Sequence, residues 1–144
     1  MAKWAQGFFT PKNPAKYIGK HKPRYRSGWE LTVMTMFDNN KAITHWASES
    51  IAIPYRNPLT GKISRYVPDF FVVYANKFGK VIAEIVEVKP KSQTSLLEAK
   101  SKHDQASAVV NQAKFKAATD YCRSNGFTFR VITESDIFKG TKNK

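Results

Sequence analysis

The chain has 144 residues, with 24 lysines and arginines against 11 aspartates and glutamates, and a net charge of +13 at pH 7. A chain of this length forms a single domain around one hydrophobic core. A charge of this size indicates a polyanionic partner, for which nucleic acid is the first expectation and a membrane surface is the alternative.

The composition also excludes several kinds of protein and site. The sequence has no apolar run long enough to cross a membrane, no signal peptide and no cleanly basic amphipathic helix, so we expect a soluble, intracellular protein without a membrane partner. The single cysteine, Cys122, excludes an internal disulfide and a zinc site built from cysteines. His21, His45 and His103 lack ligand spacing, which argues against a metal held by imidazoles.

A basic, aromatic-rich segment occupies residues 1–26, which contain seven lysines and arginines and no acidic residue. Its three prolines exclude a long helix, so we expect an extended arm that precedes a domain at 27–138. Such an arm could follow a phosphate backbone and lay its rings on sugars or unpaired bases. The basic side chains expected to contact nucleic acid are Lys12, Lys16, Lys20, Lys22, Arg24 and Arg26. The alternative is that Trp4, Phe8 and Phe9 pack on the domain while the lysines are solvated.

A helix is predicted at 27–38, because Ser27 and Glu30 form the Ser-x-x-Glu pattern of a capping box. On a helical wheel, Glu30 shares a face with Val33 and Phe37, which is the face that the helix must bury. A carboxylate on that face either contributes to a functional site or only caps the backbone amide of Ser27.

Residues 45–55 predict a strand that ends at Pro54, and residues 57–61 predict the turn that follows. Two basic residues beside this turn, Arg56 and Arg65, flank the approach to the next strand. They are either phosphate contacts or charges that face solvent.

The central pattern of the sequence is a β-hairpin at 67–89, in which two apolar stretches are joined by a short turn at 76–79. The second stretch is apolar on both faces, which predicts a strand in the centre of a sheet. Glu87 and Lys89 interrupt one of these faces. A turn at this place puts Asp69 opposite Glu87 or one residue away, with Cβ atoms roughly 5 Å apart.

The carboxylates of Asp69 and Glu87 would then repel each other, and burial would strengthen the repulsion. Either one of them is protonated or a cation lies between them. Hard oxygen ligands at this separation favour Mg²⁺ or Mn²⁺. Lys89 projects from the same face and could place a positive charge beside a reacting phosphate or its attacking water. The alternative is that Asp69 only caps a strand, while Glu87 and Lys89 neutralise each other.

A long helix and a last strand are predicted in the remainder of the chain. Residues 95–98 form a second capping box, so we expect helical sequence from there to Asn125, with a break allowed near residue 102. Its apolar stripe would comprise Ala106, Val109, Val110, Ala113, Ala117 and Tyr121. Gly126 would end the helix, followed by a strand at 127–132, a helical turn at 134–138 and a basic tail at 139–144.

Two lysines in this part lie close to the predicted site. Lys91 follows Pro90 in a loop at the end of the hairpin, where it could contact nucleic acid. Lys114 borders the apolar stripe and either points toward the predicted site or extends along the surface, with its stem covering apolar groups.

The order Pro68-Asp69 and then Glu87-Val88-Lys89 resembles the PD-(D/E)XK signature of restriction-endonuclease-like nucleases. The motifs at 25–30, 53–55, 66–70, 87–89 and 130–134 resemble the TnsA-type transposon endonucleases of that superfamily. The whole chain, including its first nine residues, is similar to the head-completion nucleases of T4-like tailed phages.

The resemblance implies an α/β sandwich with a central mixed β-sheet flanked by helices. It implies a metal-dependent DNA endonuclease in which Asp69, Glu87, Glu30 and the backbone carbonyl of Val88 hold Mg²⁺ or Mn²⁺. It also implies a role in head completion and head–tail joining after DNA packaging, in the host cytoplasm or on the virion, with DNA and head, portal or tail-joining proteins as partners. The alternative is a structural protein that binds DNA ends or the portal and has lost the catalytic activity.

Overall fold

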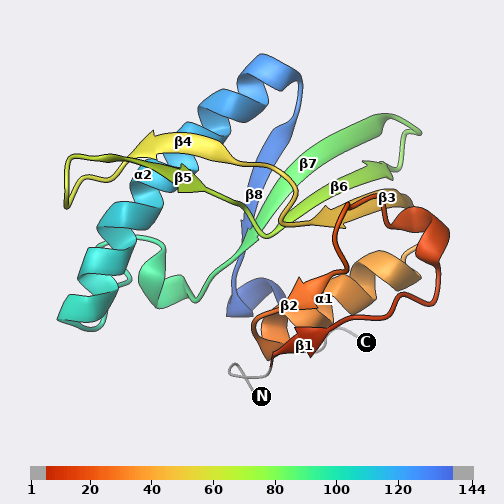
Figure 1. Ribbon diagram of the computed structural model, residues 1–144, viewed down its shortest axis with the longest axis horizontal. Coiled ribbons are helices and arrows are strands. Elements are labelled where there is room, and N and C mark those ends of the chain that lie inside the picture. The colour runs from red at the N-terminus through yellow and green to blue at the C-terminus, as the bar shows by residue number, and fades with distance from the viewer. Residues whose placement is uncertain (1–5, 138–144) are drawn as a thin grey trace.

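The computed structural model describes residues 6–137, and Figure 1 shows how their helices and strands are arranged. Trp4 and the basic tail predicted at 139–144 lie outside the described residues. Within the described part of the chain, no helix is both long and apolar enough to cross a membrane.

A four-stranded sheet forms the centre of the molecule (Figure 1). Its strands lie in the order β3 (Ile43–Ser48), β6 (Phe70–Ala75), β7 (Val81–Val88) and β8 (Thr128–Ile132). The sheet is mixed, because β7 is antiparallel to β6 and parallel to β8. Helices cover it on both sides, which confirms the predicted α/β sandwich and the central position of β7.

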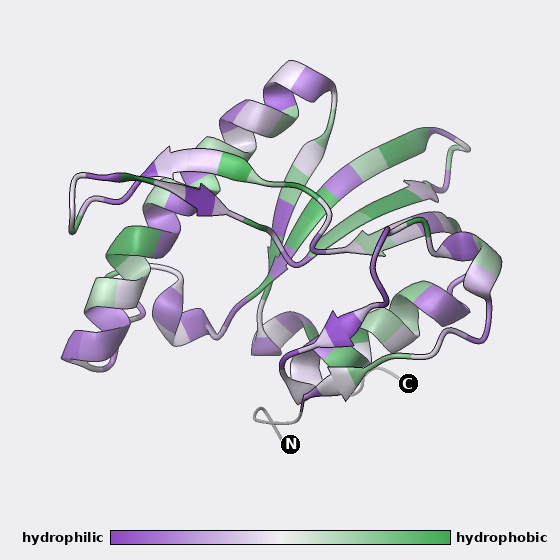
Figure 2. Cartoon of the chain, in the orientation of Figure 1, coloured by the Kyte–Doolittle hydropathy of each residue, from purple (hydrophilic) through white to green (hydrophobic). Residues whose placement is uncertain are grey.

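One helix packs on each face of this sheet. α1 (Gly28–Asn39) covers the face that carries Val86 and Val88 of β7, whereas α2 (Lys102–Asn125) covers the face that carries Ile85. Because side chains alternate along a strand, β7 contributes to both cores, and Figure 2 shows its apolar residues in the middle of the molecule. Val86 and Ile85 are both fully buried, as the two apolar faces of the pattern predicted.

α1 begins where the sequence predicts. The hydroxyl of Ser27 accepts a hydrogen bond from the backbone N–H of Glu30 at 3.1 Å, and Val33 and Phe37 are buried. The capping pattern therefore identified both the start of this helix and its buried face.

α2 begins later than predicted. The hydroxyl of Ser101 caps it by accepting a hydrogen bond from the N–H of Asp104 at 3.1 Å, whereas residues 95–98 form only a turn. Leu96 and Leu97 are 60% and 94% exposed, so a helix at that place would bury no apolar face. The predicted helix start at 95–98 is therefore wrong.

The buried stripe of α2 also differs from the predicted one. Ala106 is exposed, while the most buried positions are Ala108, Asn111, Ala118 and Cys122. Asn111 belongs to this stripe because its side-chain amide donates to the carbonyl of Gln93 at 2.7 Å, which fixes the loop after β7 to the helix. Gly126 ends the helix with a φ of 73°, as predicted.

Residues 45–55 form parts of two strands rather than one. β3 ends at Ser48, and β4 (Ile53–Arg56) begins a hairpin with β5 (Ile63–Tyr66) that packs on α2. Between them, Glu49 has a positive φ of 50°, which turns the chain out of the central sheet. Pro54 lies within β4 instead of ending a strand, because a two-stranded hairpin leaves one edge of its backbone without a required partner.

The N-terminal segment packs on the domain. β1 (Gly7–Phe8) pairs with β2 (Arg24–Tyr25), and the short 3₁₀ helix η1 (Pro14–Lys16) lies between them in the chain. Phe9 and Tyr17 contact the buried ring of Trp46 edge-on, whereas Phe8 is 60% exposed. The described part of the segment is therefore folded onto the core, and only some of its rings remain accessible.

Asp38 anchors this segment to α1. It is 2% exposed, and its carboxylate accepts hydrogen bonds from the N–H groups of Lys12 at 2.8 Å and Asn13 at 3.0 Å. The ammonium group of Lys16 donates to the carbonyls of Asp38 at 2.9 Å and Asn40 at 2.7 Å, where it caps the C-terminal end of the helix. These contacts join the N-terminal segment and α1 into one folded unit.

We expect Asp38→Ala to lower the free energy of unfolding by about 2 to 4 kcal/mol, because two backbone N–H groups lose their charged acceptor. Urea unfolding followed by circular dichroism measures the change. Asp120→Ala is the control, because Asp120 lies on the exposed side of α2 and its surface ion pairs contribute less than about 1 kcal/mol. Equal losses for the two variants would contradict the anchoring role.

Candidate active site

Asp69 and Glu87 lie opposite each other at the open end of the β6–β7 hairpin. The ladder pairs Phe70 with Val86, and one further step pairs Asp69 with Glu87. The Oδ2 atom of Asp69 accepts a hydrogen bond from the N–H of Val88 at 2.7 Å, and the Oε1 atom of Glu87 accepts one from the N–H of Asp69 at 3.1 Å. Each carboxylate is thus fixed by the backbone of the opposite strand, in the register that the hairpin pattern predicted.

Two further groups hold Glu87, which is 4% exposed. The hydroxyl of Tyr66 donates to its Oε1 atom at 2.8 Å. The ammonium group of Lys89 lies 3.5 Å from its Oε2 atom, and the side chain of this lysine is 26% exposed. Lys89 therefore pairs with a buried carboxylate while part of its side chain remains accessible from the surface.

Burial raises the pKa of both carboxyl groups. The pKa of Asp69 lies well above its usual range, first because of burial and then because of the charges of Glu87 and Glu30. The pKa of Glu87 is also raised by burial, although the charge of Lys89 and the hydrogen bond from Tyr66 oppose this effect. A cation beside the two carboxylates would favour their charged forms.

Glu30 lies near this pair, but its carboxylate has partners of its own. Its Oε1 atom accepts a hydrogen bond from the N–H of Arg26 at 3.2 Å, and its Oε2 atom lies 3.5 Å from the hydroxyl of Ser27. Burial raises the pKa of Glu30, and the nearby charges of Glu49 and Glu87 raise it further. Glu30 therefore belongs to the same electrostatic cluster while it caps α1, through the amide of Arg26 rather than that of Ser27.

The donor set fits Mg²⁺ or Mn²⁺ better than Zn²⁺. Asp69 and Glu87 supply carboxylate oxygens, and no hydrogen bond from the described residues reaches the Oδ1 atom of Asp69. Within residues 6–137, no three His, Cys, Asp or Glu side chains surround a common metal position. Zinc sites are usually built from cysteine and histidine, whereas Mg²⁺ commonly takes one or two carboxylates and completes its octahedron with water and substrate phosphate.

Two residues of the site have contacts there that the sequence patterns do not predict. Tyr66 precedes the Pro-Asp pair, but only the fold shows that its hydroxyl reaches Glu87. The carboxylate of Glu49 contacts the guanidinium of Arg26 at 3.0 and 3.2 Å, and its backbone N–H donates to the carbonyl of Asp69 at 2.9 Å. For Glu49, the only feature of the sequence that could suggest a role in the site is an acidic residue at the end of an apolar strand.

Two open hollows meet beside Lys89. One, of about 320 Å³, lies toward α1 and is lined in part by Arg26 and Glu30. The other, of about 310 Å³, lies toward α2 and is lined in part by Lys114. Lys89 and Gln93 line both hollows. The two hollows therefore adjoin the end of β7, one toward each helix, and together they are called the groove.

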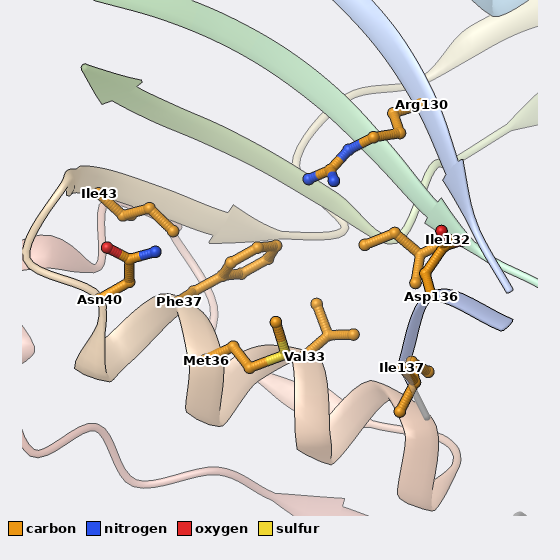
Figure 3. A pocket seen from close by; sticks show the side chains of 9 residues that line it. All are labelled: Val33, Met36, Phe37, Asn40, Ile43, Arg130, Ile132, Asp136 and Ile137. Carbon is orange, nitrogen blue, oxygen red and sulfur yellow. The ribbon is translucent and has the colours of Figure 1, made fainter. Parts of the chain in front are cut away.

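A separate hollow of about 250 Å³ lies between α1, β3 and the chain after β8 (Figure 3). Its walls are largely apolar, and two of its polar side chains have partners within the protein. Arg130 pairs with Glu84 at 3.0 Å, and the carboxylate of Asp136 accepts a hydrogen bond from the N–H of Thr133 at 2.9 Å. Neither Lys89 nor Glu30 lines this hollow, and it shares no lining residue with the two hollows beside Lys89, so it lies apart from the candidate active site.

The basic residues predicted to contact nucleic acid are exposed, with one exception. Those at the surface are Lys12, Lys20, Lys22, Arg24, Arg26, Arg56, Arg65 and Lys91. Lys16 is half-buried, and its ammonium group is occupied by carbonyls at the end of α1. Arg24, Arg26 and Arg56 also have acceptors within the protein, namely the side-chain carbonyl of Gln6, the carboxylate of Glu49 and the backbone carbonyl of Gly61. The remaining cations are more readily available to a phosphate backbone.

In metal-free protein at neutral pH, we expect Asp69→Asn to raise the melting temperature by about 3 °C or more, the shift that about 1 kcal/mol produces in a chain of this size. The substitution removes one of two buried like charges and retains an oxygen that can accept the hydrogen bond from Val88. Thermal unfolding in EDTA measures this difference. A variant that melts below the wild type at neutral pH would contradict the interpretation.

The same gain should disappear in acid. The pKa values of Asp69 and Glu87 are raised in the folded state, so folding favours their protonated forms. The associated stability is present below the ordinary carboxyl range of about 4 and is lost as the pH rises through the raised values. Thermal unfolding from about pH 4 to pH 8 should therefore show the two proteins converging toward the acid end.

Comparisons with known proteins match the chain to an endonuclease family and to a phage nuclease. Residues 40–134 match the family model described as TnsA-like endonuclease N terminal, a span that contains Asp69, Glu87 and Lys89. The chain is also 34% identical, over 149 aligned residues, to the head completion nuclease of Enterobacteria phage T4, with 93% of this chain and 97% of the relative covered. These matches confirm the resemblance stated from the sequence motifs. The chain therefore belongs to the family of TnsA-like endonucleases.

Proposed function

We propose that the protein is a divalent-metal-dependent DNA endonuclease of the PD-(D/E)XK type. The observation that carries the proposal is the carboxylate pair of Asp69 and Glu87, held face to face by backbone hydrogen bonds of 2.7 and 3.1 Å. Lys89, 3.5 Å from Glu87, completes the arrangement. Membership of an endonuclease family supports the same reaction, the hydrolysis of a DNA phosphodiester bond.

Asp69 and Glu87 would hold one or two Mg²⁺ or Mn²⁺ ions, with the carbonyl of Val88 and the carboxylate of Glu30 as further ligands. The N–H of Val88 points toward Asp69. Since the N–H and C=O of a strand residue project to the same edge, the carbonyl of Val88 opens toward Asp69 as well. Glu30 would join by exchanging its contact with the amide of Arg26. The chemistry that such a cation supplies is Lewis-acid polarisation of the phosphate.

Lys89 would orient the attacking water and stabilise the charge that develops on the phosphate. Its ammonium group lies beside Glu87 and lines both hollows, so it can contact a bound phosphate without leaving the carboxylate pair. Because the neighbouring carboxylates favour its charged form, we assign it positioning and electrostatic stabilisation rather than proton abstraction.

DNA would lie along the groove over the end of β7, beside a surface rich in positive charge. The exposed cations available to its phosphates are Lys12, Lys20, Lys22, Arg65 and Lys91. Arg24, Arg26 and Arg56 would contribute by exchanging their acceptors in the protein for phosphate oxygens. The net charge of +13 supports such a polyanionic substrate.

The relative in phage T4 is called a head completion nuclease, which supports a role in the assembly of phage heads. We extend this role to the present chain, as an enzyme that acts after DNA packaging and before head–tail joining. Its partners would be DNA and proteins of the head, the portal or the tail-joining complex. It would act in the host cytoplasm during infection, or in association with the virion.

The second candidate is a structural protein that binds DNA ends or the portal without cutting DNA. The buried carboxylate pair argues against it. The raised pKa values of Asp69 and Glu87 show that keeping both groups charged costs free energy, and a protein without metal or substrate gains nothing in return. Binding of DNA without cleavage would favour this second candidate.

Cleavage of supercoiled plasmid tests the proposed function. Wild type and Asp69→Asn are compared with Mg²⁺, with Mn²⁺ and with EDTA, after both proteins are shown to fold and to bind DNA. We expect nicked or linear plasmid only from the wild type with metal. Absence of cleavage under all three conditions, with DNA binding intact, would overturn the nuclease assignment.

We expect Lys89→Met to lower the cleavage rate by about 10² to 10³, because an electrostatic contact to the reacting phosphate is lost. DNA affinity should change little, because many other cations contact the backbone. Lys80→Met is the control, since Lys80 is exposed at the opposite end of the same hairpin. Cleavage by Lys89→Met at the rate of this control would refute the role of Lys89.

A further inference from the structure

Lys114 reaches the candidate active site from α2, on the side of the groove opposite to α1. Its ammonium group lies 5.5 Å from the ring centre of Tyr66 and 5.8 Å from that of Tyr55. Both rings are buried, so the ammonium group makes cation–π contacts with two fixed ring faces. Tyr66 is also the residue whose hydroxyl holds Glu87, which places Lys114 one side chain away from the carboxylate pair.

Lys114 differs from its neighbour Lys116 on the same helix. Lys116 has a side chain that is 79% exposed and pairs with Asp120 at 3.2 Å, as a surface lysine commonly does. Lys114 is half-buried, and within residues 6–137 its ammonium group has neither an ion pair nor a hydrogen bond to an acceptor. Its partners among the described residues are the faces of the Tyr55 and Tyr66 rings, which leaves its N–H donors able to bind an oxygen acceptor.

Electrostatic interactions connect Lys114 with the residues of the site. Burial lowers its pKa, and the nearby charge of Lys89 lowers it further, whereas Glu87 and Asp69 act in the opposite direction. The charge of Lys114 in turn opposes the rise in the pKa of Glu87. Lys89 and Lys114 repel each other at the same hollow, and an anion bound between them would offset this repulsion.

We propose that Lys114 is a second phosphate-binding residue of the nuclease site, which donates to a phosphate oxygen of the DNA strand from the α2 side while Lys89 donates from the β7 side. Both residues line the hollow of about 310 Å³ between α2 and the end of β7. The inference rests on the proposed nuclease function. The competing explanation is a lysine whose ammonium group only makes cation–π contacts with the two tyrosine rings.

Lys114→Met tests the inference, because methionine keeps an apolar stem over Tyr55 and Tyr66 and removes the charge. Lys116→Met is the matched control on the same helix, and Lys114→Arg restores a cation. Each variant is compared with the wild type in thermal unfolding, in steady-state cleavage of a DNA duplex with Mg²⁺, and in the salt dependence of DNA binding in EDTA.

We expect Lys114→Met to melt like the wild type and to lower kcat/KM by about tenfold to a hundredfold. The slope of log affinity against log salt concentration should fall by about one, which corresponds to the loss of one phosphate contact. Lys116→Met should change neither quantity, and Lys114→Arg should recover the slope.

The outcomes separate this inference from the proposed function. If the wild type cuts and Lys114→Met matches Lys116→Met in both cleavage and salt slope, Lys114 binds no phosphate and the inference is overturned. If the wild type binds DNA without cutting, the nuclease function fails, and the salt slope alone decides whether Lys114 contacts phosphate: a reduced slope supports the contact, and an unchanged slope overturns it.

Discussion

The repulsion between Asp69 and Glu87 is the constraint on which the site depends. Two carboxylates at the end of a buried strand would separate if their side chains were free to rotate. Backbone N–H groups from opposite strands prevent this, and the hydroxyl of Tyr66 holds Glu87 from a third direction. The register of the hairpin therefore aligns two strands and also keeps two carboxyl groups close together, although their charged forms repel each other. A site built in this way lowers the stability of the free protein, a cost that the proposed binding of a cation would offset.

Features that depend on local patterns could be predicted from the sequence. The register that brings Asp69 to Glu87 follows from the length of one turn, and the burial of β7 follows from apolar residues on both of its faces. The start of α1 follows from the Ser27 and Glu30 pair, whose backbone contact forms within one helical turn. In each case the residues that determine the structure are neighbours in the chain or in one hairpin.

Features that depend on distant partners could not be predicted in this way. The sequence at 95–98 matches a capping box, yet no surface of the domain covers Leu96 and Leu97. The helix therefore begins after them. Asn111 is buried because its side-chain amide donates a hydrogen bond to the carbonyl of Gln93, and a pattern of apolar residues does not predict such a contact. The contact of the Tyr66 hydroxyl with Glu87 likewise arises only when the β4–β5 hairpin folds back over α2.

The docking of the N-terminal segment changes what binding to a polyanion requires of this protein. Lys12 and Asn13 are hydrogen-bonded to Asp38, and β1 is paired with β2, so the cations between Lys12 and Arg26 lie on a folded surface. A disordered basic arm loses conformational entropy when it settles on a nucleic acid, and that loss weakens its binding. Here the ordering has already taken place during folding. The described part of the segment therefore presents its charges in a fixed spatial arrangement. A polyanion that bound there would meet a surface that is already folded.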